Sequence, residues 1–367
     1  MERKLKIGII GTGNIAGHHV KYYKGFDDVE VTAGADIVPG KARQFFERMG
    51  LPNAHSYENV EEMLRNEQLD GVSVCTYHRA HAPCSIAALE AGVHVLCEKP
   101  MSFTLQEAVD MVKASRKSGK FLTIGYQPRY DYLRQRVDEI ISSGQLGKIY
   151  YIESGGGRRR GIPSKDRDSY INSEKAGYGV IGDNGCYSVD ECLHAVKYPR
   201  PLTVSAAASS HFGKRKQHCH YPDIFDVEDF ATALVRLEGD ITFVVKTAWA
   251  MHSDTMGNTM WLGTEGGIKI ISGFSHANLP SSVMYFTDVN GQHTDSFILP
   301  NVNQLAHEKI GPADIWTAKM RNFCDAVRKG GPAPIPGEEV LYNQAILDGM
   351  YRSAKLNREV EIVIPDL

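Results

Sequence analysis

The first 125 residues repeat one pattern, in which short apolar runs alternate with amphipathic segments. The apolar runs have the length of β-strands and lie at residues 5–10, 29–35, 71–76, 93–97 and 121–124. The amphipathic segments carry apolar residues at helical spacing and lie at residues 15–23, 41–49, 80–91 and 105–117. This βαβα order predicts an α/β fold with a doubly wound parallel sheet covered by helices on both faces.

The pattern changes after residue 125. A helix is expected over residues 132–142, and strands are expected at residues 148–154, 202–208, 230–237, 241–249, 260–263 and 283–287. Turn sequences such as LEGD and DVNG separate the strands, which favours antiparallel pairing in a large open sheet. The length of 367 residues also favours two domains. We expect a nucleotide-binding domain over residues 1–125 and an α+β domain over residues 126–367, with a further helix at residues 338–356.

Charge and cysteine content narrow the kind of partner. The chain has 41 basic and 44 acidic residues, so its net charge of −3 favours neither nucleic acid nor an anionic membrane. Seven cysteines without paired spacing argue against a disulfide framework and suit a reducing compartment. No apolar run approaches the ~18 residues of a membrane span, and the N-terminal run is too short for a signal peptide. These features predict a cytoplasmic protein with a small-molecule partner.

A glycine motif follows the first expected strand. Gly11, Gly13 and Ala16 form GxGxxA, in which the first glycine permits a tight turn and the second lets backbone approach a pyrophosphate. Asp36, at the end of the second expected strand, is placed to accept hydrogen bonds from an adenosine ribose. An ordinary turn with a loop aspartate is the alternative. Because Ile37 rather than an arginine follows Asp36, the sequence favours NAD over NADP.

The tripeptide Glu98-Lys99-Pro100 ends another expected strand. Ligands of open α/β sheets bind beyond the carboxyl ends of the strands, where a lysine could reach a substrate hydroxyl beside a nicotinamide. Pro100 restricts its own backbone and that of Lys99. The alternative is a surface lysine in the loop before a helix.

Four ionisable side chains recur at helical spacing later in the chain. At about 100° per residue, Asp183, Tyr187, Asp190 and His194 fall on one side of a helix and could face a cleft. An amphipathic helix with a solvated face, capped by Asp183, is the alternative.

Two further clusters contain side chains of the kinds that bind ligands or metals. Arg158, Arg159, Arg160 and Arg167 lie in a glycine-rich loop, where Arg158 or Arg160 could bind a carboxylate or phosphate of a substrate. A solvated or interface surface is the alternative. The sequence HCHYPD, which includes His218 and His220, does not have the spacing of a tetrahedral metal site, so no metal is expected.

Several motifs together resemble the Gfo/Idh/MocA family, which includes glucose–fructose oxidoreductase and inositol dehydrogenases. The resemblance rests on GTGNIAG, Asp36, CTYHRAHAPCSIAALEAGVHVLCEKP, GYGVIGDNGCYSVD, GTEGGI and PIPGEEVL, and it runs through most of the chain. It implies a Rossmann domain, a C-terminal domain with an open sheet, a homo-oligomer (dimer or tetramer), and nicotinamide-dependent chemistry on sugars or cyclitols.

The resemblance also implies roles for individual residues. Lys99 matches the lysine of the family's EKP motif, and Asp183 and Tyr187 fall in its DxGxHxxD motif, with Tyr187 at the usual histidine position as in glucose–fructose oxidoreductase. A phenol has a pKa near 10 and is a poor base unless a neighbouring ammonium stabilises its anion, a charge that Lys99 could supply. The expected cofactor-binding residues are Gly11, Gly13, Asn14, Ile15, Asp36, Thr76, His81, Glu98 and Lys99. Tyr77 and His78 depart from the family's TPNxxH segment.

These observations predict an NAD(H)-dependent dehydrogenase acting on a CH–OH group of a sugar, cyclitol or sugar derivative. Lys99 and Tyr187 would share the acid/base role, and Asp183 would orient Lys99 or bind the substrate. Two alternatives stay open: a glycoside-cleaving enzyme that retains its NAD, and a non-catalytic sensor of sugars or nucleotides.

Overall fold

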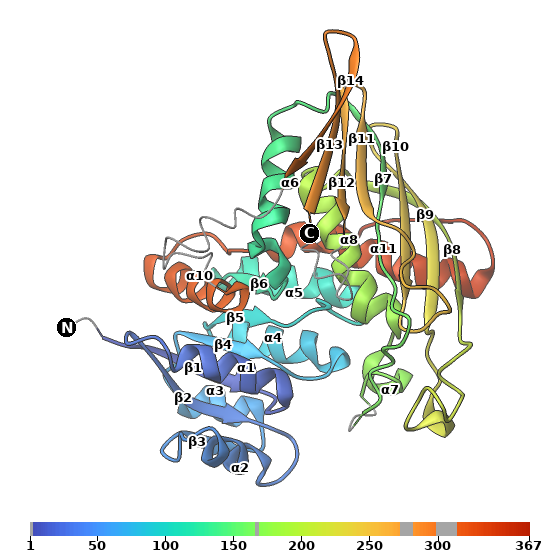
Figure 1. Cartoon of the computed structure of the whole chain (residues 1–367). Helices are drawn as coiled ribbons and strands as arrows, with labels where there is room; N and C mark the ends of the chain where they lie inside the picture. The colour runs from blue at the N-terminus through green and yellow to red at the C-terminus, as the bar shows by residue number, and fades with distance from the viewer. Residues whose placement is uncertain (1–2, 166–168, 272–281, 299–313) are drawn as a thin grey trace. The chain divides into compact units, whose positions relative to one another are not determined.

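The computed structural model describes residues 3–165, 169–271, 282–298 and 314–367, which contacts divide into two compact units (Figure 1). The first unit contains the described residues up to Gln127 together with Asp314–Gln344 and Pro365–Leu367. The second contains the described residues from Pro128 to Ile298 together with Ala345–Ile364. The expected division into residues 1–125 and 126–367 therefore did not anticipate that the chain returns to the first unit.

The first unit is built on a six-stranded parallel sheet with the strand order β3-β2-β1-β4-β5-β6. Its strands are β1 (Leu5–Ile10), β2 (Val29–Ala35), β3 (His55–Tyr57), β4 (Gly71–Val74), β5 (His94–Cys97) and β6 (Leu122–Ile124). The connecting helices are α1 (Asn14–Tyr23), α2 (Lys41–Arg48), α3 (Val60–Asn66), α4 (His81–Glu90) and α5 (Leu105–Ser118), with a 3₁₀ turn, η1, at His78–Ala80. The doubly wound parallel sheet predicted from the sequence is confirmed.

The strand order places the ligand-binding edge of this sheet. Strand β1 lies between β2 and β4, and the winding of the chain reverses there. Ile9 and Ile10 of β1, whose side chains point to opposite faces of the sheet, are both buried, as expected for a strand covered on both faces. The carboxyl ends of β1 and β4 at this switch point are where open α/β sheets bind ligands.

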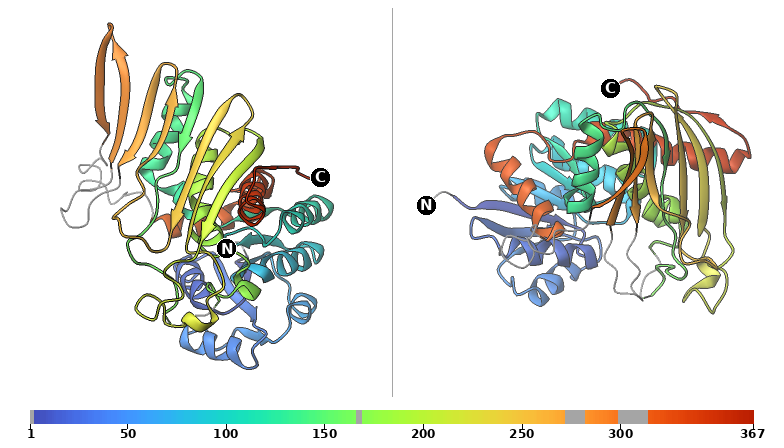
Figure 2. Two further views of the ribbon diagram at one scale, coloured as in Figure 1. Left: turned by 90° about the vertical axis from the view of Figure 1, so that its right-hand side faces the viewer. Right: turned by 45° about the horizontal axis from the view of Figure 1, so that its top comes forward.

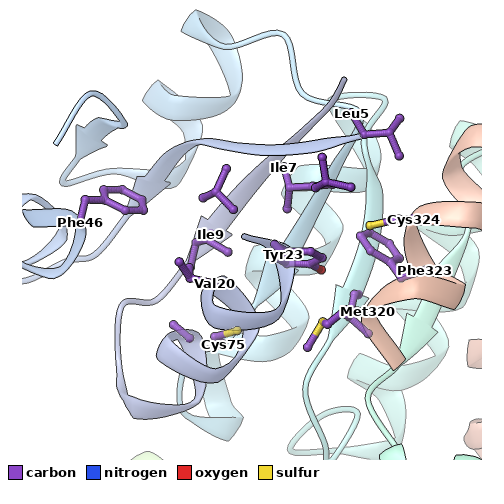
Figure 3. Close-up of a cluster of buried hydrophobic side chains, with 14 of the residues drawn as sticks. Leu5, Ile7, Ile9, Val20, Tyr23, Phe46, Cys75, Met320, Phe323 and Cys324 are labelled. Carbon is purple, nitrogen blue, oxygen red and sulfur yellow. The ribbon is translucent and has the colours of Figure 1, made fainter. Parts of the chain in front are cut away.

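A late segment completes the core of the first unit. Helix α10 (Ile315–Lys329) buries Met320, Phe323 and Cys324 in one cluster with β1 and α1 (Figure 3). Gly71 of β4 permits this packing, because a methyl group there would lie 2.7 Å from Phe323 Cζ. The spacing of these apolar residues is helical, but spacing alone does not reveal which domain they cover.

The second unit is built on a large mixed sheet, nine-stranded within the described residues. Its order is β14-β13-β12-β11-β7-β10-β9-β8-β15, and every described pair is antiparallel except β7 with β10. The strands are β7 (Ile149–Glu153), β8 (Pro201–Ser209), β9 (Phe230–Leu237), β10 (Ile241–Ala248), β11 (Thr259–Gly263), β12 (Gly266–Ile271), β13 (Ser282–Val289), β14 (Gln292–Ile298) and β15 (Val360–Glu361). The predicted open, mainly antiparallel sheet is confirmed.

Helices cover one face of this sheet. Figure 2 shows α6 (Tyr132–Ser142) and α8 (Cys186–Ala195) running along the strands. Helix α8 follows directly from a π-helical turn at Ile181–Gly185. Residues of α11 (Gly337–Leu356) up to Gln344 belong to the first unit and those from Ala345 to the second. The short elements are η2 (Gln127–Tyr130), α7 (Ser173–Ala176) and η4 (Pro222–Ile224).

Two global features complete the description. All seven cysteines carry free thiols. Within the described part of the chain, no helix combines the length and apolar character needed to cross a membrane.

Candidate active site

The glycine motif forms the turn between β1 and α1. Gly11 has a φ of +83°, and a methyl group there would lie 2.8 Å from Thr76 Cγ2. A methyl group on Gly13 would meet nothing within 4 Å. Gly13 is also the N-cap of α1, which has neither a side-chain cap nor an acidic residue in its first turn. Open space before uncapped helix N–H groups fits the pyrophosphate of a dinucleotide.

Asp36 is held at the end of β2 by several donors. Its Oδ2 accepts hydrogen bonds from Thr12 N at 2.9 Å and Thr12 Oγ1 at 2.8 Å, and its Oδ1 accepts one from Val38 N at 3.1 Å. Lys41 Nζ lies 2.9 Å from Oδ2. Burial opposes ionisation of Asp36, but Lys41 and these hydrogen bonds outweigh it and lower the pKa. Oδ1 retains acceptor capacity, which fits a ribose hydroxyl.

The preference for NAD inferred from Ile37, which follows Asp36 in place of an arginine, left the negative charge of Asp36 without a cation. Lys41 compensates that charge from the first residue of α2. The turn between β2 and α2 brings it back to the carboxylate, and adjacency in sequence does not reveal this.

Glu98 and Lys99 follow β5 as expected, but their side chains differ in environment. Glu98 is 4% exposed, and its Oε1 lies 2.7 Å from His19 Nε2 and accepts a hydrogen bond from Lys319 Nζ. Lys99 is half-buried. The carboxylate expected beside the cofactor is therefore engaged inside the first unit, by partners far away in the sequence.

His81 connects two of the predicted cofactor segments. Its Nδ1 lies 2.7 Å from the Pro100 carbonyl oxygen, and its Nε2 lies 3.2 Å from the Thr76 carbonyl oxygen. Burial lowers the pKa of His81, so the neutral ring donates one of these bonds. With both nitrogens facing backbone carbonyls, His81 holds the ends of β4 and β5 in place.

A cavity of about 250 Å³ lies within the second unit. Side chains of α6, α8 and the sheet surround it, together with the loop after β7. Its lining residues are Pro128, Arg129, Arg134, Val137, Asp138, Gly155, Gly156, Gly157, Arg158, Asn184, Tyr187, Ser188, Asp190, Glu191, His194, Thr247, Trp261 and Ile270. Most of these side chains are polar, which suits a ligand with many hydrogen-bonding groups.

The three carboxylates of the cavity each have a cationic or histidine partner. Arg129 Nε donates to Asp190 Oδ2 at 2.9 Å, and Arg129 Nη2 donates to Asp190 Oδ1 at 2.6 Å. Arg134 lies 2.7 Å from Glu191, and His194 Nε2 lies 3.2 Å from Asp138 Oδ2. Asp190, which matches the last acid of the motif, thus forms a buried ion pair.

The four side chains predicted on one helix face have different surroundings. Tyr187, Asp190 and His194 line the cavity, and Asp183 is not among its lining residues. Asp183 instead accepts a hydrogen bond from Trp249 Nε1 at 3.0 Å. The prediction assumed α-helical rotation, but Asp183 lies in the π-helical turn, whose wider winding changes its direction relative to α8.

The arginines of the glycine-rich loop separate into two environments. Arg158 lines the cavity, and no ion pair or side-chain hydrogen bond of Arg158 is found among the described residues. Arg160 Nη1 donates to the Met251 carbonyl oxygen at 2.9 Å, and its guanidinium lies 5.6 Å from the Phe212 ring centroid. Arg160 therefore fastens the loop. Arg167 lies outside the described residues.

The histidines near residue 220 have structural contacts. His220 Nδ1 lies 3.2 Å from Ser164 Oγ, and the His218 ring packs edge-on against Phe212 at 5.2 Å. Within the described residues, no group of three or more His, Cys, Asp or Glu side chains is arranged to hold a metal ion.

Lys99 belongs to the first unit, and Asp183 and Tyr187 belong to the second. Each unit positions its own residues by the contacts described above. The shared acid/base role of Lys99 and Tyr187 stays a prediction.

A parallel sheet with a glycine turn at its switch point, in a chain that also forms a unit with a large mixed sheet, defines a two-domain nucleotide-binding protein. Residues 5–126 match the Gfo/Idh/MocA oxidoreductase family, NAD-binding Rossmann fold, and residues 134–269 match the Gfo/Idh/MocA C-terminal domain. The chain belongs to the Gfo/Idh/MocA family of NAD-dependent oxidoreductases.

Named relatives cover the chain to different extents. The chain is 27% identical over 366 residues to D-glucoside 3-dehydrogenase of Escherichia coli strain K12. This alignment covers 98% of the chain and 97% of the relative. The chain is 31% identical over 148 residues to myo-inositol 2-dehydrogenase of Thermotoga maritima. This alignment covers 40% of the chain and 44% of the relative. A solved structure of levoglucosan dehydrogenase in complex with NADH and levoglucosan shares the fold. The TM-score is 0.81 at 19% identity, and the match covers 98% of this chain and 100% of that one.

Proposed function

We propose that this protein is an NAD-dependent dehydrogenase that acts on a secondary alcohol of a sugar, cyclitol or sugar derivative. The observation that carries the proposal is the polar cavity of the second unit, which Tyr187 and Thr247 both line. Thr247 is 1% exposed, and its hydroxyl has no hydrogen-bond partner among the described residues. A buried hydroxyl without a partner is unfavourable, and a polyhydroxylated ligand would supply one.

The cofactor preference follows from the first unit. NAD would place its pyrophosphate at Gly11, Gly13 and the start of α1, and its ribose at Asp36. When bound, NAD supplies the carbon that accepts or gives the hydride. The buried Asp36 carboxylate should repel a 2′-phosphate more strongly than the half-exposed Lys41 ammonium attracts it. NAD is therefore favoured over NADP.

Lys99 and Tyr187 would handle the proton of the reacting hydroxyl. In oxidation the C–H hydrogen would leave with its electron pair as hydride to the cofactor, and the O–H proton would pass to the Tyr187 phenolate, which becomes a neutral phenol. The Lys99 ammonium would stabilise the phenolate and the negative charge that develops on the substrate oxygen. Asp183, held by the Trp249 indole, would orient Lys99 or bind a second hydroxyl of the substrate.

Arg158 would extend the substrate range to sugars that carry an acid group. Among the described arginines of the loop, Arg158 is the one that lines the same cavity as Tyr187. A guanidinium binds a carboxylate through two parallel hydrogen bonds. Uronic acids therefore belong among the candidate substrates, next to the glucosides and inositols suggested by the names of the relatives.

A substrate screen tests the proposal. The purified protein is incubated with NAD or NADP and a panel of glucosides, inositols and uronic acids, while absorbance at the NADH band and product identity are followed. Net NADH formation with a ketone product is expected. Glycosidic bond cleavage without net NADH would support the NAD-retaining alternative, and tight NAD binding without turnover would support the sensor. Mass measurement in solution tests the proposed dimer or tetramer.

A further inference from the structure

A buried ion pair lies at the turn that carries Lys99. Glu98 is 4% exposed and Lys319 is 2% exposed. Lys319 Nζ donates to Glu98 Oε1 and lies 3.4 Å from the Gly125 carbonyl oxygen. His19 Nε2 lies 2.7 Å from the same carboxylate oxygen. One oxygen atom thus connects α1, the end of β5 and α10, all within the first unit.

Lys319 supplies the charge that balances Glu98. Burial opposes ionisation of Glu98, but Lys319 and the His19 hydrogen bond hold its pKa well below the ordinary value. Burial and then the Lys319 charge lower the pKa of His19 to about 4, with a smaller contribution from His18, so the His19 ring is neutral near pH 7. Tyr23 and Cys75 also interact with this carboxylate, and burial raises their pKa values, so both stay uncharged.

The fold leaves space for this pair and for nothing larger. A methyl group at Gly125 would lie 2.9 Å from Lys319 Nζ and 3.1 Å from Glu98 Oε1. The Lys319 ammonium also lies 4.7 Å from the Trp316 ring centroid. Lys319 is therefore enclosed on several sides, and its position follows that of α10.

Helix α10 has separate anchors to the first unit. Arg321 Nη1 lies 2.8 Å from Asp28 Oδ1, and Met320 and Phe323 are fully buried. These contacts fix α10 without involving Glu98. The helix can therefore act as a rigid support for the carboxylate.

Backbone geometry links Glu98 to its neighbour. Glu98 N donates to the Val74 carbonyl oxygen at 3.0 Å, and the next residue, Lys99, lies in a bend. Because Glu98 is buried and Lys99 is half-buried, holding the Glu98 carboxylate inside the unit fixes the point from which the Lys99 side chain leaves the backbone. We propose that Lys319 is a positioning residue, which sets the direction of the Lys99 ammonium by holding the Glu98 carboxylate inside the first unit. This inference rests on the proposed role of Lys99.

The test measures the environment of Lys99 directly. The protein is pulse-labelled with acetic anhydride, and mass spectrometry gives acetylation of Lys99 relative to the exposed Lys113 of α5. In Lys319→Met, Glu98 keeps only the His19 contact at 2.7 Å, so the carboxylate is no longer tied to α10 and can approach the ammonium of Lys99. We expect Lys99 to be labelled several-fold more slowly. Gly125→Ala, which separates the pair without removing a charge, should act in the same direction.

Arg321→Met is the matched control. It removes two ion pairs of the same helix, with Asp28 and Asp325, but does not touch Glu98. Its Lys99 labelling should equal that of the unmodified protein, even if its melting temperature falls as far as that of Lys319→Met. If Lys319→Met and Gly125→Ala both leave Lys99 labelling unchanged, or if Arg321→Met changes it equally, the inference is wrong.

Kinetics separate this inference from the proposed function. On a substrate found by the screen, Lys319→Met should lower kcat by up to ~10²-fold, because small displacements of a reacting group are costly, while the Kd for NADH stays unchanged. An active Lys99→Ala variant would refute the proposed role of Lys99. An inactive Lys99→Ala together with unchanged kcat in Lys319→Met would refute the positioning role alone.

Discussion

Lys41 Nζ lies 2.9 Å from Asp36 Oδ2, so the carboxylate at the end of β2 carries its own cation. The two charges act in opposite directions on a cofactor with a 2′-phosphate. Asp36 is buried and close to the glycine turn through Thr12, whereas the Lys41 side chain is 45% exposed. Solvent screens the lysine more strongly, so the aspartate should dominate the preference.

The first prediction concerns this pair. We expect kcat/KM with NAD to exceed that with NADP by at least ~10-fold, about 1.4 kcal/mol. Lys41→Met should widen the difference by up to roughly fivefold, because exposed charge contacts contribute about 0.2–1 kcal/mol. Asp36→Ser should narrow the difference in kcat/KM between NAD and NADP. Arg43→Met, on the same helix, is the control. Equal kcat/KM for both cofactors in the unmodified protein would contradict the assignment of Asp36.

The second prediction concerns the acid/base pair. Lys99→Ala and Tyr187→Phe should each lower kcat by about 10²–10⁴, the usual contribution of a positioned acid or base, and leave NAD binding intact. Because the two residues would act as one unit, the double variant should lose much less than the product of the single losses. Multiplicative losses would indicate two independent roles.

Tyr187→His is a sharper probe of the same pair. An imidazole has an unperturbed pKa near 6.5, so this variant should recover part of the activity lost in Tyr187→Phe. It should also move the basic limb of the pH profile of kcat downward. A Tyr187→His variant no better than Tyr187→Phe would show that position 187 does not exchange the proton.

The third prediction separates two arginines of one loop. Arg158→Gln should raise KM for a uronic acid by ~10-fold or more, because a charge-assisted hydrogen bond contributes roughly 1.5–3 kcal/mol. Neutral sugars should be unaffected. Arg160→Gln is the control, since Arg160 is engaged by the Met251 carbonyl and Phe212. If no anionic compound is a substrate and both variants have normal kinetics, Arg158 is an ordinary surface residue.

The fourth prediction concerns a buried acid behind the π-helical turn. Glu228 Oε1 accepts a hydrogen bond from Ile181 N at 3.0 Å, and burial raises the pKa of Glu228 to about 7. A raised pKa means that the folded state binds the proton more tightly than the unfolded state. The stability from this group is therefore fully present below pH ~4.5 and is lost as pH rises through about 7.

Glu228→Gln keeps the acceptor for Ile181 N but cannot ionise. The melting temperature of Glu228→Gln, relative to that of the unmodified protein, should rise between pH 5 and pH 8. The rise should correspond to at most ~3 kcal/mol in the free energy of unfolding. Glu238→Gln, at an exposed position just after β9, serves as the control. A difference between Glu228→Gln and the unmodified protein that stays constant with pH would show that Glu228 is already ionised at pH 5.

The sequence predicted the elements whose hydrophobic pattern is local. The bounds of β1 and β2 agree with the prediction, because apolar runs end there at polar or glycine residues. Strand β3 was missed because its three residues, His55–Tyr57, are not buried and form no apolar run. Long-range pairs were missed for another reason: His19 and Lys319 lie 79 and 221 positions from Glu98, and no local pattern reports such a distance.

The return of α10 has a consequence for how the chain is made. Met320, Phe323 and Cys324 fill the core of the first unit, yet the ribosome adds them about 200 residues after Gln127. At a synthesis rate of roughly 5–20 residues per second, these side chains are added ~10–40 s after the N-terminal sheet. During that interval the apolar surface of β1 and α1 is without its cover. Biosynthesis of this family member should therefore depend on chaperones that shield a half-built domain, and truncation at residue 127 should yield an aggregating fragment.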